Sequence, residues 1–175
     1  MAVLIEALSV VIRCEAIAKK YIGGMDAFIA ALPNKSLCSD GELARVRFMV
    51  PIDVQAYVES LIANGLTFKR SDKAIDIVVV DQLHGPTTDC DWVDVGETDW
   101  NNNPNHTVAV CCARPTKVDR IFVPEGWRYE ESLSASGIYI DGKEVPESLK
   151  FARHENGVDV LLDEKTGQEF YVGRS

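Results

Sequence analysis

Hydrophobic and polar positions follow two different periods over the first 81 residues of the chain. Residues 2–13 are almost continuously apolar, which is typical of a strand that is buried on both faces. Residues 14–32 carry apolar side chains at helical spacing, and Gly23 and Gly24 predict a break inside this helix because glycine lowers helix stability. Residues 36–49 predict a hairpin that turns at residues 39–41.

The clearest helix signal begins at Pro51 and ends before Gly65. Proline suits the first turn, where its missing N–H costs nothing, and glycine suits the left-handed position just past the last turn. A strand over residues 75–81 follows. The order strand, helix, strand, strand, helix, strand predicts an α+β fold with an N-terminal ferredoxin-like βαββαβ unit.

The last third of the chain is mostly β-rich, and Asn156–Gly157 is a strong two-residue hairpin signal. The strand signals cover residues 108–112, 120–123, 137–140, 151–155, 158–162 and 169–172, with one helical turn expected within residues 127–133. We therefore expect a βαββαβ unit over residues 1–81, an acidic connecting segment over residues 82–106, and a β-rich antiparallel part over residues 107–175 that packs on the first. Together they are expected to form one compact domain.

The charge is distributed unevenly along this pattern. No Lys or Arg occurs between Ala74 and Ala113, yet this stretch holds seven of the nine excess negative charges of the chain. Like charges repel as a chain compacts, so a fold that tolerates such a cluster is expected to use it against something cationic. Most of these acids fall in residues 82–106, and a connection longer than about 15 residues is usually functional or disordered. A short strand over residues 92–95 fits inside it.

The acidic segment predicts a binding module that sequesters or regulates a basic protein partner, as an inhibitor or immunity protein does. Clustered carboxylates can occupy a surface that evolved for phosphates, and tryptophan is strongly enriched at binding hot spots. The alternative is a solvated strand and loop whose tryptophans pack inward. The residues expected to contact the partner are Asp89, Asp91, Trp92, Asp94, Glu97, Asp99 and Trp100.

The rival interpretation is an enzyme, or a protein that binds a small molecule or a metal, with a cleft between the N-terminal unit and the β-rich part. The cleft would be lined by Glu6, His84, Asp91, His106 and Cys111, of which all but Asp91 are catalytic candidates. The chain has no Cys-x-x-Cys, Gly-x-Ser-x-Gly or phosphate-cradling motif, and its aspartates lack EF-hand spacing. We therefore expect no cofactor and no metal site.

Glu6 stands out because a carboxylate in an apolar strand is costly unless it has a partner. It could act as a buried acid, or it could reach water or bond to an arginine such as Arg13 or Arg45.

The net charge, the pI and the cysteine content of the chain limit the kinds of partner and the location that we expect. A net charge of −9 and a pI near 4.8 oppose binding to a phosphate backbone or to an anionic membrane surface. Five cysteines without recognised spacing are read as reduced thiols, and the location is expected to be cytoplasmic. A third interpretation is a homodimeric structural or sensory domain, because sheets of this type associate through an edge or a face.

Residues 53–68, DVQAYVESLIANGLTF, resemble the helix-to-strand unit of the vicinal-oxygen-chelate superfamily of glyoxalases and dioxygenases. The resemblance implies a metal enzyme with a His ligand on the first strand and a Glu ligand on a later one. The first strand here, residues 2–13, contains no His, so no functional residue is carried over.

Overall fold

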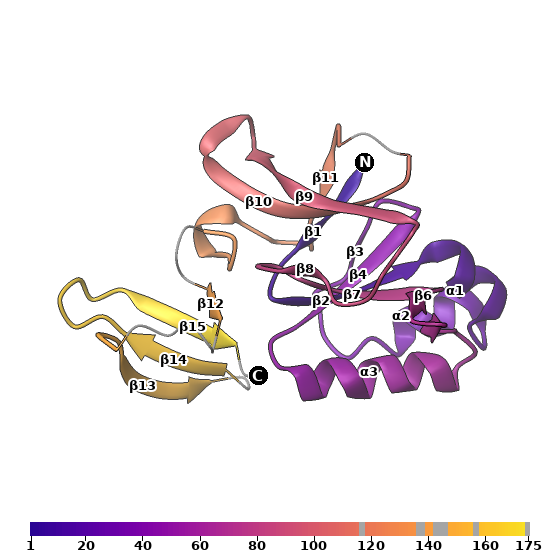
Figure 1. The fold of residues 1–175 in the computed structure, drawn as a ribbon, viewed down its shortest axis with the longest axis horizontal. Helices are drawn as coiled ribbons and strands as arrows, with labels where there is room; N and C mark the ends of the chain where they lie inside the picture. Colours follow the sequence, from indigo (N-terminus) through magenta and orange to yellow (C-terminus); the bar gives the residue numbers. More distant parts are fainter. Residues whose placement is uncertain (116–117, 136–138, 142–146, 156–157, 174–175) are drawn as a thin grey trace.

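The computed structural model describes residues 1–115, 118–135, 139–141, 147–155 and 158–173 (Figure 1). These residues form an α+β structure with three α-helices and four open sheets, whose strands pair mostly antiparallel. The helices are α1 (Cys14–Lys20), α2 (Gly24–Ala30) and α3 (Pro51–Ala63). The break predicted at Gly23 and Gly24 is confirmed, and no described helix is long and apolar enough to span a bilayer.

The central sheet has the strand order β3-β4-β2-β7-β8, and all its neighbouring strands are antiparallel. Its strands are β2 (Leu8–Arg13), β3 (Cys38–Ser39), β4 (Leu43–Phe48), β7 (Ile77–Asp81) and β8 (Gly85–Pro86). The three helices cover one face, where Val10, Ile12 and Ile77 pack against Phe28 and Leu61. The two-residue strands β5 (Lys69–Arg70) and β6 (Lys73–Ala74) form a separate hairpin.

A second sheet covers the other face of the central sheet. Its order is β11-β1-β10-β9, formed by β1 (Ala2–Ile5), β9 (Val93–Trp100), β10 (Asn103–Ala113) and β11 (Ile121–Phe122). Val3, Ile5 and Cys111 of this sheet pack against Val11 and Val78 of the central one. Residues 123–135, including the short 3-10 helix η1 (Tyr129–Glu131), cover its outer face, so the body has four layers.

The expectation of one strand over residues 2–13 is wrong, because this run is divided between the two sheets. The chain turns at Glu6 and Ala7, and Ala7 adopts a positive φ of 47°. Gln82 holds the corner: the Ala7 N–H donates to its side-chain Oε1 at 2.8 Å, and its own N–H donates to the Ala7 carbonyl at 2.9 Å. The Glu6 N–H and carbonyl also bond to the Ser9 hydroxyl. An apolar run can thus be buried in two sheets without being one strand.

Residues 82–106 are not a structureless connection. They contain β8, β9 and the start of β10, and the pairing of β9 with β10 extends from Val93 and Ala113 to Trp100 and Asn103. Only the start of β9 carries the alternating pattern of a strand, since Val93 and Val95 are separated by the exposed Asp94. Asn101 and Asn102 form the turn with φ near 52° and 56°, values that asparagine tolerates better than most residues.

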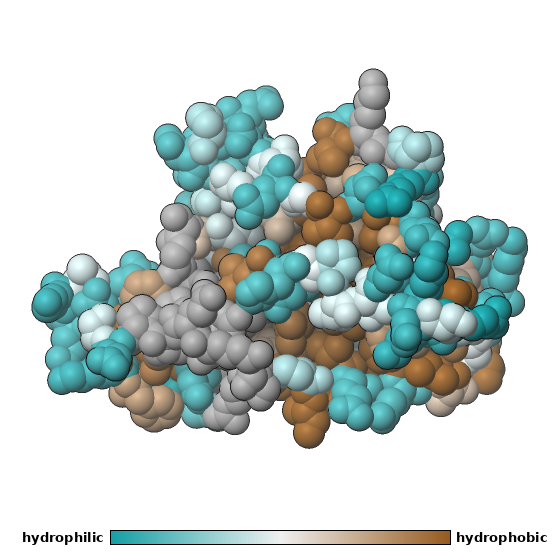
Figure 2. Space-filling model, in the orientation of Figure 1, coloured by the Kyte–Doolittle hydropathy of each residue, from teal (hydrophilic) through white to brown (hydrophobic). Residues whose placement is uncertain are grey.

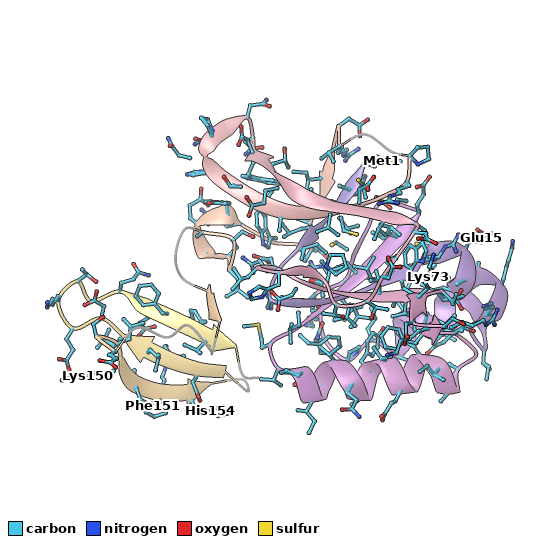
Figure 3. All side chains as sticks on the ribbon, in the orientation of Figure 1. Met1, Glu15, Lys73, Lys150, Phe151 and His154 are labelled. Carbon is cyan, nitrogen blue, oxygen red and sulfur yellow. The ribbon has the colours of Figure 1, made fainter. Side chains whose placement is uncertain are left out.

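The C-terminal sheet lies to one side of the body and has the order β12-β15-β14-β13 (Figure 1). Its strands are β12 (Tyr139–Asp141), β13 (Lys150–Glu155), β14 (Val158–Leu162) and β15 (Glu169–Gly173). Strands β13 and β14 pair antiparallel as predicted, although the turn residues Asn156 and Gly157 lie outside the described residues. Lys150, Phe151 and His154 project from β13 away from the body (Figure 3).

Candidate functional site

The acidic segment forms the open edge of the second sheet, because β9 is its last strand and no described strand pairs with the outer side of β9. Val93 and Val95 face the core between the sheets, and Glu97 and Asp99 continue the same face beyond it, where they are exposed. Figure 2 shows that this end of the hairpin projects from the body as a hydrophilic protrusion. Asp94 is exposed on the opposite face of the strand.

Lys73 and Arg114, at the two ends of the stretch without Lys or Arg, form ion pairs with acids inside it. Lys73 Nζ lies 3.1 Å from Asp91 Oδ2, and Arg114 Nε lies 2.8 Å from Asp94 Oδ1. The hydrogen bonds to these carboxylates raise the pKa of Lys73 and of Arg114 above their ordinary values. Asp89, Glu97 and Asp99 are exposed and form no ion pair with a described residue, so the unneutralised charge lies at the distal end of β9 and at Asp89 before the strand.

The two tryptophans of the predicted contact set pack within the molecule. Trp92 donates from Nε1 to the Ala74 carbonyl at 3.1 Å, and the Arg13 guanidinium lies 5.3 Å from the centre of its ring. Trp100 contacts Trp127 edge-on, with ring centroids 4.8 Å apart. This arrangement corresponds to the inward-packing alternative for both indoles, which are half-buried.

The residues of the rival cleft contact side chains outside that set. His84 lies 3.4 Å from Asp81 at the surface, and His106 stacks on Tyr129 with ring centroids 4.3 Å apart. Cys111 is completely buried between the two sheets, and burial raises the pKa of its thiol. Among the described residues, no group of three or more His, Cys, Asp or Glu side chains is placed to hold a metal ion.

Glu6 is fully buried at the corner between β1 and β2, where its carboxylate has several partners. Trp127 Nε1 donates to Oε1 at 2.9 Å, and the Ser134 N–H and hydroxyl donate to Oε2 at 3.0 and 2.8 Å. Its arginine partner is Arg47, with Nη1 at 3.9 Å from Oε1, and not Arg13 or Arg45. The carboxylate therefore fastens residues 124–134 to the body.

Arg45 was proposed only as a partner for Glu6, but the structure gives it another role. Its side chain is fully buried, and Nε and Nη2 each lie 3.3 Å from Cys38 Sγ, while Nη1 has no hydrogen-bond partner. Burial raises the pKa of the Cys38 thiol, and the Arg45 charge opposes this shift. A buried guanidinium paired with a neutral thiol leaves positive charge uncompensated.

A pocket of about 460 Å³ lies between the N-terminal unit and residues 124–127, and Arg47 is part of its wall. It is lined by residues 34–36, 47–49 and 53 on one side and by residues 124–127 on the other. The rival interpretation expected a cleft between these two parts but named none of the residues that line this pocket. Arg45 and Arg47 alternate along a predicted strand and therefore had to share one face. Trp127 gave no signal, because it reaches Glu6 from 121 residues away.

No protein-family model, no curated protein and no solved structure matches the chain. The resemblance of residues 53–68 to the vicinal-oxygen-chelate superfamily thus remains confined to those residues, and the functional argument depends on the geometry of the chain itself.

Proposed function

We propose that the chain is an acidic cytoplasmic binding module that holds a basic, extended segment of a protein partner along the free edge of β9. The observation that carries the proposal is an eight-residue edge strand whose distal acids, Glu97 and Asp99, are exposed and have no ion pair with any described residue. The net charge of −9 favours a basic protein over a nucleic acid or an anionic membrane.

The free edge offers a mode of recognition that fits such a segment. An added strand bonds to the unpaired N–H and C=O groups of the edge, and its alternate side chains meet those of β9. Lysine or arginine at every second position of the incoming strand would lie opposite Glu97 and Asp99. Cross-strand pairs of opposite charge stabilise such pairing, and attraction between the surfaces speeds encounter.

The competing explanation is that these acids only protect the edge, since natural proteins place charges on edge strands to prevent association. The two explanations differ in the ligand that they allow. A protective edge rejects every added strand, whereas a recognition edge accepts a basic strand and rejects an acidic or neutral one.

The test uses a soluble peptide that alternates lysine and threonine, titrated calorimetrically at roughly 50 and 200 mM salt. We expect saturable binding that weakens with salt. The variant carrying Glu97→Gln and Asp99→Asn should bind about tenfold more weakly at low salt, because both charge pairs are lost. The matched control, Glu42→Gln with Glu59→Gln, removes the same charge from exposed positions of the N-terminal unit and should leave binding nearly unchanged.

A second peptide distinguishes strand pairing from simple charge attraction. Methylation of alternate backbone nitrogens removes the N–H donors along one edge of the peptide but keeps its charge, so it should abolish binding if β9 is the site. The proposal is rejected if the methylated peptide binds equally well, or if the two double variants lose affinity equally.

We also propose that residues 8–81 form a ferredoxin-like unit. The strand order β3-β4-β2-β7, with all neighbours antiparallel and the helices on one face, supports this assignment. The unit would serve as the rigid base on which the second sheet is mounted.

A further inference from the structure

We propose that the pocket beside Arg47 binds a small carboxylic acid with an apolar body. The pocket lies between the end of β4, the loop before β3 and the turn at residues 124–127. Its volume of about 460 Å³ is within the usual range for small-molecule sites, about 300–1,000 Å³. The inference is independent of the β9 edge, which is formed by other residues.

The Arg47 side chain supplies the recognition group. It is about one-third exposed and lines the pocket, and its guanidinium forms no hydrogen bond with a described residue. Its single ion-pair contact is with Glu6 at 3.9 Å, a distance too long for a hydrogen bond. A guanidinium presents five N–H donors in a planar fork that matches a carboxylate, so this side chain has recognition capacity that the protein does not use.

The unused donors of Arg47 indicate that the ligand group placed against them is an anion. Arg45 and Arg47 lie on the same face of β4, and Glu6 is the one carboxylate that forms an ion-pair contact with Arg47 among the described residues. The pKa of Arg47 is lowered by burial, raised by Glu6 and lowered again by Arg45. Both oxygens of Glu6 already accept hydrogen bonds from Trp127 and Ser134, so this carboxylate cannot turn towards Arg47 without losing them.

The other walls select the rest of the ligand. Phe48, Met49 and Trp127 give the pocket apolar surface against which a hydrocarbon or aromatic body can pack. Two carboxylates, Asp53 and Glu125, and one ammonium group, Lys35, also line the pocket. These two carboxylates disfavour a dianion such as phosphate, so a singly charged carboxylate suits the site better.

The test uses phenylacetate as the probe, with phenylacetamide, inorganic phosphate and methylammonium as comparison ligands. Binding to the full chain is followed by tryptophan fluorescence, because Trp127 lines the pocket, and by titration calorimetry. We expect saturable binding of phenylacetate and at least tenfold weaker binding of the neutral amide, which lacks the charge that Arg47 recognises. Phosphate should bind more weakly than phenylacetate, and the bare cation should not compete with it.

Three variants are expected to lower, leave unchanged and raise the affinity for phenylacetate. Arg47→Met keeps the length of the side chain and should weaken phenylacetate binding tenfold or more, while the matched Arg70→Met on the exposed β5 strand should not. Asp53→Asn removes a repelling carboxylate at the start of α3 and should tighten binding several-fold. Because Asp53→Asn is a gain of affinity, it cannot be mimicked by damage to the fold, and circular dichroism of each variant checks folding directly.

The proposal is overturned if the acid and its amide bind equally, if Arg47→Met and Arg70→Met behave alike, or if phosphate binds more tightly than phenylacetate. It is also overturned if Asp53→Asn leaves the affinity unchanged. Each of these outcomes leaves the β9 edge untouched, because Glu97 and Asp99 are not part of the pocket.

Discussion

Carboxylates occur in two contrasting settings in this molecule, the interior corner at Glu6 and the exposed edge of β9. At the corner, one carboxylate is fully buried and accepts three hydrogen bonds, besides lying within 4 Å of Arg47. At the edge, Glu97 and Asp99 are exposed and have no ion pair among the described residues. The same chemical group is thus a structural element in one place and free for an external partner in the other.

The contrast follows from the cost of removing a charge from water. A buried carboxylate is tolerated only when protein donors replace its hydration, so its surroundings become part of the fold. An exposed carboxylate keeps its water and contributes little to stability, which leaves it available for exchange with a cation from outside. Position in the fold, more than residue type, separates the two roles.

The largest expected effect is a loss of stability when the Glu6 carboxylate at the corner is removed. Glu6→Ala removes the acceptor of Trp127 Nε1 and of the Ser134 hydroxyl and the charge facing Arg47, while the Ser134 N–H keeps only the Ser132 hydroxyl, at 3.2 Å. We expect the free energy of unfolding to fall by about 3–5 kcal/mol, as for other broken buried charge contacts. Urea denaturation followed by circular dichroism measures the change. A loss below about 1 kcal/mol would show that water replaces the carboxylate and that the corner is not essential.

The corner also shows what the sequence could and could not reveal. The helices, the hairpin of residues 38–48 and the C-terminal strands follow from local spacing, so they were predicted closely. The division of residues 2–13 was missed because the turn at Ala7 is held by Gln82, a partner 75 residues away. Glu6 was recognised as unusual from its apolar neighbours, but Trp127 and Ser134, its hydrogen-bond partners, have no local signature.

The second prediction concerns the buried thiol of Cys111 at alkaline pH. Burial between the two sheets raises the pKa of Cys111 well above its ordinary value of 9.0. A raised folded pKa gives stability that is complete below the unfolded pKa and is lost as pH rises above it, because only the unfolded chain releases the proton there. We expect about 1.4 kcal/mol of stability to be lost per pH unit above about pH 9 for this thiol.

Denaturant titrations at intervals between pH 8 and pH 10 measure this slope, with Cys111→Ala as the comparison. The variant should be less stable at pH 8, because a buried group is removed, but its stability should fall less steeply with pH. Equal slopes for the two proteins would show that Cys111 ionises as easily in the folded state as in the unfolded state.

For the candidate sites, too, the sequence shows the local features but not the tertiary contacts. The absence of Lys and Arg from residues 74–113 correctly marked an acidic segment, but spacing along the chain could not show that Lys73 and Arg114 return to Asp91 and Asp94. Arg114 reaches Asp94 because β9 and β10 pair, and Lys73 reaches Asp91 because it forms a bridge with Asp89. Charge counted along the sequence therefore overstates the free charge. The contacts of Trp92 with Arg13 and of Trp100 with Trp127 likewise depend on tertiary structure, so the sequence could not choose between the inward-packing and the partner-binding alternatives.

The smallest expected effect separates paired from unpaired acids within the edge itself. Replacing Glu97 and Asp99 with Gln and Asn removes repulsion without removing an ion pair, so the melting temperature at low salt should rise by about 1–2 °C. Arg114→Gln removes the partner of Asp94 and should lower it by a similar small amount. Differential scanning calorimetry at roughly 10 mM salt measures both shifts, and both should shrink at about 1 M salt, where the Debye length is about 3 Å. A decrease for the first variant that persists at high salt would mean that Glu97 and Asp99 stabilise the hairpin by contacts other than charge, which would leave them less free for a partner than the structure indicates.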